Sequence, residues 1–235
     1  MNIGRIVDRL LSPFGLVILR RPQEPKDTTA DMYLQPSQSR IIYRFEHFLA
    51  TRDIEGLIIE AGVGTGWGMG FWMSLKRYFG DSRMVWGFDS FAGFPKTFLN
   101  ESSWFQKNYK SINDQYKKFD LPYVTSKLKD LQLSDEEMME LELIKGFMPD
   151  SFDALGDHKV SLLNVDGDLY QTVKDTLDYF VPRMPPGARV LLDEYDLPDD
   201  IRKWPGAKLA VDEICEKYGL TLSISYGGRP YILIK

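Results

Sequence analysis

Cysteine and histidine are scarce in this chain. Its one cysteine, Cys215, excludes an intrachain disulfide and a zinc site built on clustered cysteines, and it indicates a reducing compartment. Its two histidines, His47 and His158, are too few for a histidine-based metal cluster. A serine–histidine–aspartate triad would depend on one of these two. His47 falls off the apolar stripe of a helix predicted to begin at Ser37, so we expect it at the surface or half-buried.

A surplus of positive charge and a long apolar run are also missing. The 29 Lys and Arg residues are outnumbered by 34 Asp and Glu, and the net charge of −5 gives no electrostatic case for a nucleic-acid partner. The apolar stretch near the N-terminus is broken by Asp8, Arg9 and Pro13. It stays far below the roughly 20 residues of a spanning helix, and no small-residue cleavage site follows it. We therefore expect a cytoplasmic protein without a transmembrane segment.

Two parts of the chain differ in composition. Residues 1–36 form an N-terminal segment and a proline-containing linker, and residues 37–235 are long enough for one α/β domain with a large core. We expect the N-terminal segment to pack on this domain or on a second subunit, which favours a homo-oligomer. The alternative is a basic amphipathic helix in peripheral contact with an anionic membrane.

A glycine-rich turn follows a short apolar strand that ends at Glu60. Its glycines stand at every second position, in Gly62, Gly64, Gly66, Gly68 and Gly70. Glycine lets backbone amides approach a ligand closely, but the dinucleotide pattern G-x-G-x-x-G is absent. The pattern is E-x-G-x-G-x-G, and an acid at this strand end would repel a pyrophosphate while accepting hydrogen bonds from an ammonium group or ribose hydroxyls. This chemistry favours S-adenosylmethionine, bound by Glu60, Gly62, Gly64 and Gly66. A packing turn of another α/β protein is the alternative.

A second strand, predicted over residues 84–88, ends at Asp89. An acid at the tip of the second strand, after a glycine turn and a helix, is placed to bind both hydroxyls of a ribose. This strand–turn–helix–strand–acid order is the context that the glycine turn requires, so it favours a nucleoside-containing cofactor.

An insertion over about residues 96–140 interleaves aromatic residues with lysines. It is long for a simple connection, and Ser134 with Glu137 predicts a capping box that opens a short helix. Aromatic and basic side chains together are suited to a lid over a polar substrate such as a sugar. The alternative is an amphipathic helical insertion with a solvated lysine face.

Four carboxylates follow two strands further along the chain. A strand over residues 159–165 ends in Asp166-Gly167-Asp168, and the strand Arg189–Leu192 ends in Asp193-Glu194. The carboxyl ends of adjacent parallel strands lie at the ligand-binding edge of an open sheet. Four acids without histidine suit a hard cation such as Mg²⁺. The alternative for Asp168 is the N-cap of the helix that follows it.

The remaining segments complete an α/β pattern. Residues 207–218 predict a helix whose Leu209, Val211 and Ile214 face the sheet, and two strands around Tyr226-Gly227-Gly228 predict a hairpin. The hairpin makes the last strand antiparallel to the others. We therefore predict a class I methyltransferase (Rossmann-like) sheet, mostly parallel with an antiparallel C-terminal strand and helices on both faces.

These motifs resemble the macrocin O-methyltransferase (TylF) family over residues 54–213. The resemblance rests on the glycine turn at 60–66, Asp89-Ser90-Phe91 within 85–95, Gly146-Phe147 with Asp150, Asp166–Tyr170, Asp193-Glu194-Tyr195, and Trp204-Pro205-Gly206 with 210–213. Two departures stand out. Glu194 occupies a position where the family usually has aspartate, and Gly64-Thr65-Gly66 replaces the family's Trp-Arg-Gly.

The resemblance implies a metal-dependent enzyme that methylates a hydroxyl of a sugar on a natural product or surface glycan. It implies that Asp89, with Ser90 beside it, binds the cofactor ribose and that Asp166 is the general base. It also implies that Mg²⁺ is held by Asp168, Asp193 and Glu194. The alternatives are a metal-dependent glycosyltransferase that binds a nucleotide sugar through Asp166-Gly167-Asp168, and a non-catalytic assembly subunit on the same fold.

Overall fold

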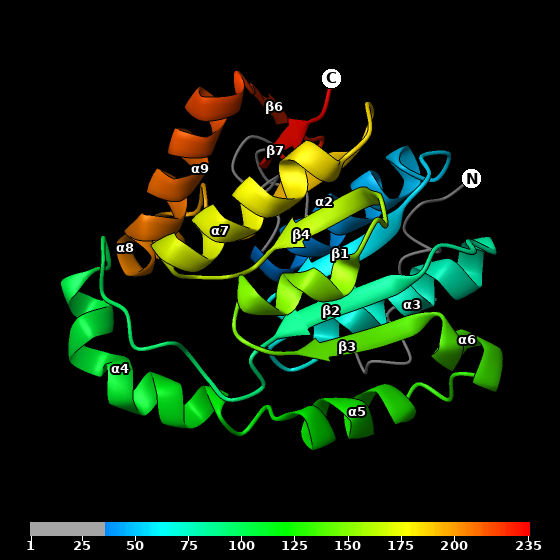
Figure 1. Cartoon of the computed structure of the whole chain (residues 1–235), viewed down its shortest axis with the longest axis horizontal. Helices are drawn as coiled ribbons and strands as arrows, with labels where there is room; N and C mark the ends of the chain where they lie inside the picture. Colours follow the sequence, from blue (N-terminus) through cyan, green and yellow to red (C-terminus); the bar gives the residue numbers. More distant parts are fainter. Residues whose placement is uncertain (1–35) are drawn as a thin grey trace, which may run out of the picture.

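A seven-stranded sheet forms the centre of the computed structural model, which describes residues 36–235 (Figure 1). The strand order is β3-β2-β1-β4-β5-β7-β6. The first five strands in this order run parallel, whereas β7 runs antiparallel to β5 and β6 antiparallel to β7. The strands are β1 (Leu57–Ala61), β2 (Val85–Asp89), β3 (Leu141–Lys145), β4 (Val160–Val165), β5 (Arg189–Leu192), β6 (Leu222–Ile224) and β7 (Pro230–Leu233). The predicted mostly parallel sheet with its C-terminal hairpin is confirmed.

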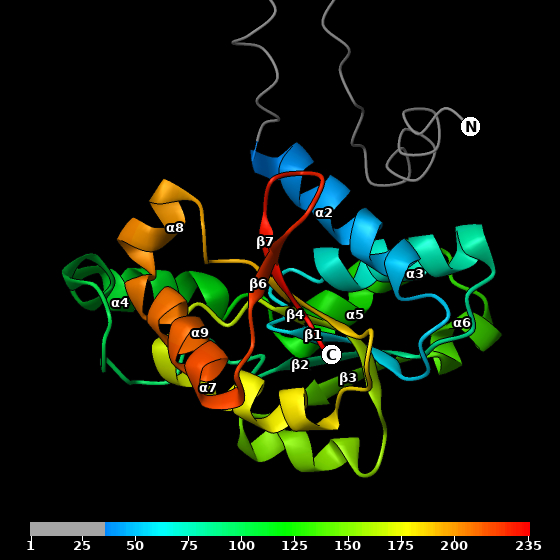
Figure 2. The ribbon, with the colours of Figure 1, turned by 90° about the horizontal axis from the view of Figure 1, so that it is seen from above.

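Helices cover both faces of the sheet, as Figure 2 shows with α2 and α3 on one side and α7 on the other. Ile58 of β1 and Leu162 of β4 face α2 and α3, while their neighbours Ile59 and Leu163 face α7. This alternation is expected of strands that are buried on both sides. The helices are α2 (Pro36–Ala50), α3 (Trp67–Phe79), α4 (Ser103–Tyr116), α5 (Leu121–Lys129), α6 (Asp135–Met139), α7 (Tyr170–Phe180), α8 (Pro198–Lys203) and α9 (Pro205–Tyr218), with short 3₁₀ helices at Asp150–Leu155 and Val181–Arg183.

The predicted insertion at 96–140 contains helices α4, α5 and α6. α6 begins with the predicted capping box, in which the Ser134 hydroxyl accepts from the Glu137 amide and the Glu137 carboxylate accepts from the Ser134 amide. α4 is capped by Ser102, whose hydroxyl also donates to the carbonyl of Lys203 at 2.6 Å. The insertion is therefore anchored to the end of α8.

The expectation for His47 was wrong, because its side chain is fully buried. α2 packs on β5 and β7 as well as on α3, so a second row of the helix is covered. The imidazole lies 4.3 Å from the Tyr231 ring between centroids, and its Nδ1 is 2.8 Å from Nη1 of Arg189. Burial, followed by the nearby Arg189 charge, lowers the pKa of His47 to about 3.

Leu209 was also wrongly placed on the inner face of α9, since 41% of it is exposed. α9 packs mainly on α7, with Ala207, Ala210, Val211 and Ile214 buried. The predictions for the N-terminal segment fall almost entirely on residues 1–35, outside the described part of the chain. Among residues 36–235, none of the helices combines the length and the hydropathy needed to cross a bilayer.

Candidate active site

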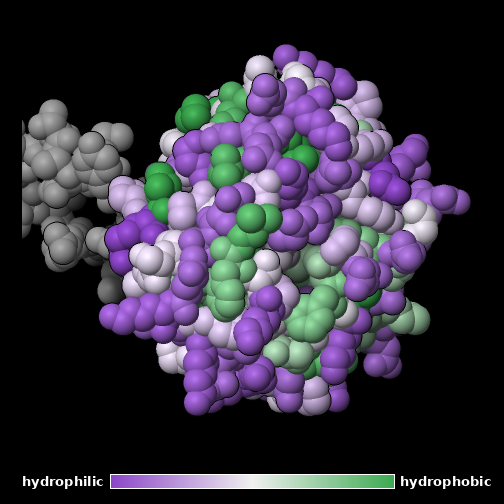
Figure 3. Space-filling view, turned by 60° about the vertical axis from the view of Figure 1, so that its left-hand side comes forward, coloured by the Kyte–Doolittle hydropathy of each residue, from purple (hydrophilic) through white to green (hydrophobic). Residues whose placement is uncertain are grey.

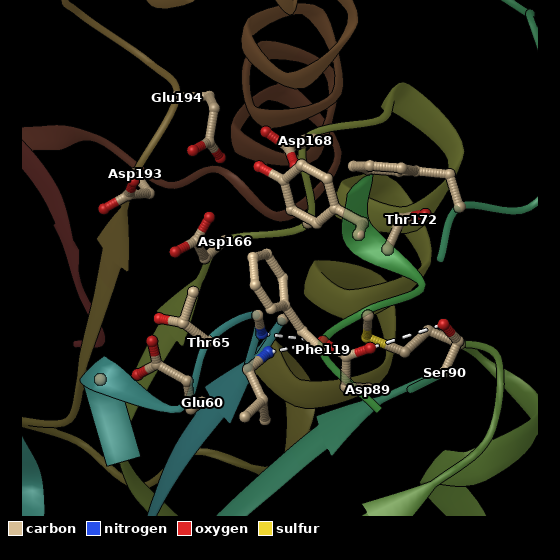
Figure 4. A pocket seen from close by; sticks show the side chains of 18 of the residues that line it. Glu60, Thr65, Asp89, Ser90, Phe119, Asp166, Asp168, Thr172, Asp193 and Glu194 are labelled. Carbon is tan, nitrogen blue, oxygen red and sulfur yellow. Dashed lines mark hydrogen bonds between the residues drawn. The ribbon is translucent and has the colours of Figure 1, made fainter. Parts of the chain in front are cut away.

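A cavity of about 400 Å³ lies at the carboxyl ends of the parallel strands. Figure 4 shows Asp166, Asp168, Asp193 and Glu194 along one part of its wall, with Glu60 and Asp89 along another. The structure thus gathers nearly all the predicted site residues in one place. Ser90, Gly62 and Gly64 also line the cavity, whereas Gly66 does not.

Asp89 holds the glycine turn in place. Its Oδ2 accepts hydrogen bonds from the amides of Val63 at 2.8 Å and Gly64 at 3.0 Å (Figure 4). Its Oδ1 accepts one from the amide of Phe91 at 2.8 Å. Ser90 donates to the carbonyl of Gly93 at 2.6 Å and thereby shapes the adjoining loop. The carboxylate predicted to bind ribose therefore also joins β2 to the turn after β1.

Glycine is required at Gly62, where φ is +99° and a Cβ would overlap the carbonyl oxygen of Asp166. This close approach brings the turn after β1 against the acids after β4. Gly66 has a different task, because it caps α3 in the left-handed conformation and faces Val124. Direct binding of the cofactor by Gly66 remains a prediction. From this position, Gly66 would act by setting where α3 begins.

Below the glycine turn, Glu60 and Arg44 form a buried ion pair with 3.0 Å between Oε1 and Nη2. Trp72 donates to Glu60 Oε2 at 2.6 Å, and Asn164 donates to Oε1 at 3.2 Å. Burial raises the pKa of Glu60, against the opposing effect of Arg44. Burial lowers the pKa of Arg44, but the carboxylates of Glu60, Asp193 and Asp166 raise it by more. The guanidinium therefore stays charged.

Asp166, Asp168 and Glu194 form a group of acids with one carboxylate oxygen from each within 4.8 Å of the others. Burial, followed by the charge of Asp193, raises the pKa of Asp166 to about 8. Burial and then the Asp166 carboxylate raise the pKa of Asp168 and of Glu194 well above ordinary values. Asp168 does not cap the following helix, because the N-cap of α7 is Leu169. Part of each pKa increase comes from repulsion between the carboxylates, and a bound cation would offset this repulsion.

Asp193 lies next to these three acids but is not part of their group, and it contacts two arginines. Its Oδ2 is 3.0 Å from Nη2 of Arg40, and its Oδ1 is 3.9 Å from Nη2 of Arg44. Burial opposes ionisation, but Arg40, Arg44 and Arg229 together lower the pKa of Asp193. The group that lies close enough for one ion in this structure therefore contains Asp166 in place of Asp193.

Arg229, which is 1% exposed, holds the turn after β5. Its Nη2 donates to the carbonyls of Leu192 at 3.2 Å and Asp193 at 2.6 Å. Tyr43 of α2 supports the same turn, since its hydroxyl accepts from the Leu192 amide at 3.0 Å and donates to the Pro230 carbonyl. The position of the Asp193-Glu194 pair thus depends on the first described helix and on the C-terminal hairpin.

Aromatic side chains also line the cavity. Tyr116 at the end of α4 and Phe119 after it come from the insertion, and they are joined by Phe94, Phe147 and Trp204. The rings of Phe94 and Tyr116 meet edge to face with 4.7 Å between centroids, and Phe94 stacks on Trp204 at 5.9 Å. On the side of the molecule that carries α4 and α8, apolar side chains gather around a hollow in a mostly polar surface (Figure 3).

Comparison with known proteins agrees with the motifs. The family model for macrocin-O-methyltransferase (TylF) matches residues 43–222, which is more than half of the chain. The chain belongs to the TylF family. The predicted family resemblance is thereby confirmed, and it now extends from α2 to β6.

Two curated relatives are named as O-methyltransferases, and the name of the first includes a rhamnosyl group. The 8-demethyl-8-(2,3-dimethoxy-alpha-L-rhamnosyl)-tetracenomycin-C 4'-O-methyltransferase of Streptomyces olivaceus is 25% identical over 173 residues, covering 73% of this chain and 62% of the relative. The mycinamicin III 3''-O-methyltransferase of Micromonospora griseorubida is 27% identical over 178 residues, covering 73% and 65%. The matched part of this TylF protein therefore spans less than two thirds of the length of these relatives.

Solved structures support the fold. The O-methyltransferase NovP superposes with a TM-score of 0.68 at 22% identity, covering 85% of this chain and 79% of NovP. The calicheamicin methyltransferase CalS11 superposes with a TM-score of 0.60 at 18% identity, covering 91% and 99%. The predicted class I methyltransferase fold is confirmed for this member of the TylF family.

Sequence reasoning missed three arginines that line or support the site: Arg40, Arg44 and Arg229. Arg40 and Arg44 are four residues apart and so share one face of α2, a spacing that was visible in the sequence. Their acidic partners were visible too, but the pairing depends on how α2 packs across β1 and β5. Arg229 carried no local signal, because it follows a hairpin turn where a solvated arginine is ordinary.

Proposed function

We propose that this TylF protein is an S-adenosylmethionine-dependent O-methyltransferase whose acceptor is a sugar hydroxyl on a natural product or glycan. The observation that carries the proposal is the single cavity that joins the Glu60–Gly64 turn and Asp89 to the acids after β4 and β5. The family match and the O-methyltransferase relatives support the reaction class. The glycosyltransferase alternative would leave Asp89 and the glycine turn without a role.

In this reaction the acceptor oxygen attacks the methyl carbon of the sulfonium, the carbon–sulfur bond breaks, and S-adenosylhomocysteine leaves. The sulfonium is already activated, so the protein has to align the reactants, which contributes about 7 to 11 kcal/mol in well-oriented systems. Asp89 and the turn would hold the cofactor, and the aromatic wall with Tyr116 and Trp204 would hold the sugar ring. Asp166 would take the proton that the acceptor hydroxyl loses.

The acids fit a hard divalent cation. Asp166, Asp168 and Glu194 each place a carboxylate oxygen within 4.8 Å of the other two, and Oε2 of Glu194 is buried without a hydrogen-bond partner among the described residues. We propose that Asp168, Asp193 and Glu194 hold Mg²⁺, which requires the Asp193–Arg40 pair to open. A bound Mg²⁺ would lower the pKa of a coordinated acceptor hydroxyl.

Calorimetric titration of S-adenosylhomocysteine, with Mg²⁺ and again with chelator, tests the proposal first. We expect binding in both conditions, and a turnover that chelator abolishes once an acceptor sugar is supplied. Uridine and guanosine diphosphate sugars are the control ligands. Binding of a nucleotide sugar without binding of S-adenosylhomocysteine would refute the methyltransferase assignment.

The Asp166→Asn variant tests the division of roles among the acids. We expect turnover to be lost while Mn²⁺, used in place of Mg²⁺ and followed by electron paramagnetic resonance, still binds. If Mn²⁺ affinity falls as well, Asp166 is the third ligand instead of Asp193. The Asp193→Asn variant is the matched measurement, because it should weaken Mn²⁺ binding only if Asp193 is a ligand.

The proposals of a homo-oligomer through residues 1–36 and of a cytoplasmic location rest on the sequence. Sedimentation of the full chain and of a variant lacking residues 1–35 tests the first. We expect the full chain to be an oligomer and the shortened chain to be a monomer.

A further inference from the structure

Arg44 has hydrogen-bonding capacity that the described protein does not use. Its side chain is 3% exposed, and Nη2 contacts Glu60, yet Nη1 and Nε are buried without a hydrogen-bond partner among residues 40–235. The guanidinium lies 5.2 Å from the ring centroid of Trp67 and 5.4 Å from that of Trp72. A buried N–H donor without an acceptor is costly, so an arginine in this state is poised for an anion.

The first turn of α3 lies against the same guanidinium. Nη1 is 2.5 Å from the point where a Cβ on Gly68 would stand, and Gly68 is the second residue of this helix. No side chain caps the N-terminus of α3, whose N-cap is Gly66. The positive end of a 13-residue helix therefore adjoins the Arg44 guanidinium, whose Nη1 and Nε lack hydrogen-bond partners among the described residues, and Arg44, Trp67 and Gly68 all line the cavity.

The neighbouring charges decide which anion fits. Glu60 is ion-paired to Arg44, and Asp166 lies 3.7 Å from Nη2. These carboxylates would repel a sulfate or a phosphate. An α-amino acid group carries one carboxylate beside one ammonium, and it is therefore complementary to an arginine beside a glutamate.

The order of the strands places the Arg44–Glu60 pair at one end of the proposed cofactor site. Asp89 is at the end of β2, Glu60 is on β1, and Asp166 follows β4, with β1 paired between the other two strands. In Figure 4, Glu60 and Asp89 lie on opposite sides of the lower part of the pocket. A cofactor with its ribose at Asp89 and its sulfonium toward Asp166 would bring its amino-acid end over β1.

We propose that Arg44 binds the carboxylate of the methionine moiety of S-adenosylmethionine, with Glu60 accepting from its ammonium. This inference rests on the proposed methyltransferase function and assigns a cofactor contact to a residue of α2, outside the glycine turn. The competing explanation is that Arg44 serves only as a counter-charge for Glu60 and Asp166.

The test compares S-adenosylhomocysteine with its decarboxylated analogue by calorimetry. We expect the wild type to bind the analogue about 10- to 100-fold more weakly, the range for a lost hydrogen bond to a charged group. We expect Arg44→Met to weaken binding of S-adenosylhomocysteine by a similar factor and to leave binding of the analogue unchanged. Arg52→Met is the matched control, because Arg52 is exposed beside Phe79 and outside the cavity lining.

Removing Arg44 alone leaves Glu60 buried without its counter-charge, so the double variant Arg44→Met/Glu60→Gln is made in parallel. Equal weakening of both ligands in these variants, or equal binding of both ligands by the wild type, would overturn the proposal while the methyltransferase function stands. Failure of the wild type to bind S-adenosylhomocysteine would instead refute the proposed function, and the Arg44 assignment with it.

Discussion

Gly68→Ala probes how tightly the first turn of α3 packs on the buried ion pair. An added Cβ would overlap Oε1 of Glu60 and would lie 2.5 Å from Nη1 of Arg44. Neither group can rotate away easily, because Trp72 and Asn164 hold the Glu60 carboxylate and the rings of Trp67 and Trp72 flank the guanidinium. The substitution therefore forces the helix or the ion pair to move.

Two effects of opposite sign set the magnitude. Alanine is favoured over glycine inside a helix by about 1 kcal/mol. Overpacking a filled interior costs about 1 to 3 kcal/mol, and the upper part of this range applies because the overlapped atoms are charged and buried. We expect the free energy of unfolding of Gly68→Ala to fall by about 2 kcal/mol. We also expect weaker binding of S-adenosylhomocysteine.

Urea denaturation followed by tryptophan fluorescence measures the first effect, and calorimetry measures the second. Gly80→Ala is the control. Gly80 ends the same helix with a φ of +64°, and a Cβ there would meet nothing within 4 Å, so only left-handed strain of about 1 kcal/mol is expected, with unchanged ligand binding. A Gly68→Ala protein as stable as the wild type would refute the tight packing of α3 on Glu60 and Arg44.

Three further substitutions test separate parts of the structure. Asp89→Asn should weaken S-adenosylhomocysteine binding about 10- to 100-fold in calorimetry, because an amide cannot accept from Val63, Gly64 and Phe91 together; unchanged binding would remove Asp89 from the cofactor site. Burial raises the pKa of Glu101 to about 7, so the folded state keeps a proton that the unfolded chain loses above its ordinary pKa of about 4.5, and stability falls as pH rises through this window. A pKa raised from about 4.5 to about 7 corresponds to about 3 kcal/mol, so the free energy of unfolding of Glu101→Gln, measured with urea, should exceed that of the wild type by about 3 kcal/mol at pH 8 and equal it at pH 4; a constant difference across pH would contradict this assignment. Arg229→Met should lower stability by about 3 kcal/mol and weaken Mn²⁺ binding while sparing S-adenosylhomocysteine, since Arg229 donates to the turn after β5 and lies outside the cavity lining; intact Mn²⁺ affinity would show that Glu194 is positioned without it.

The predicted elements follow from local patterns. β5 has the predicted bounds, and β2 and β4 each begin one residue later than predicted, because short apolar runs between turn residues specify a buried strand without reference to distant parts of the chain. The location of the acids follows from the same logic. Any residue just after a parallel strand lies at one edge of the sheet, so Asp89, Asp166 and Glu194 were expected to meet in one region.

The pairing of charges could not be read in this way. Asp193 and Glu194 are adjacent in the sequence, yet Asp193 pairs with Arg40 while Glu194 joins Asp166 and Asp168. Successive residues at a strand end point in different directions, and the arginine that selects one of them comes from a helix more than a hundred residues earlier. The burial of His47 has the same origin, since β7 covers a face of α2 that helical periodicity alone marks as outer.

Local patterns in the sequence were sufficient to predict the α/β architecture, the TylF family, and the edge of the sheet where cofactor and acids would meet. Apolar periodicity, glycine spacing and strand-end acids act over a few residues, and they retain their meaning in any packing of the elements. Which carboxylates lie close together and which are neutralised by arginine became visible only in the folded structure. Those pairings depend on distances of a few ångströms between elements that are remote in the chain, where Coulomb energy and desolvation change steeply with position.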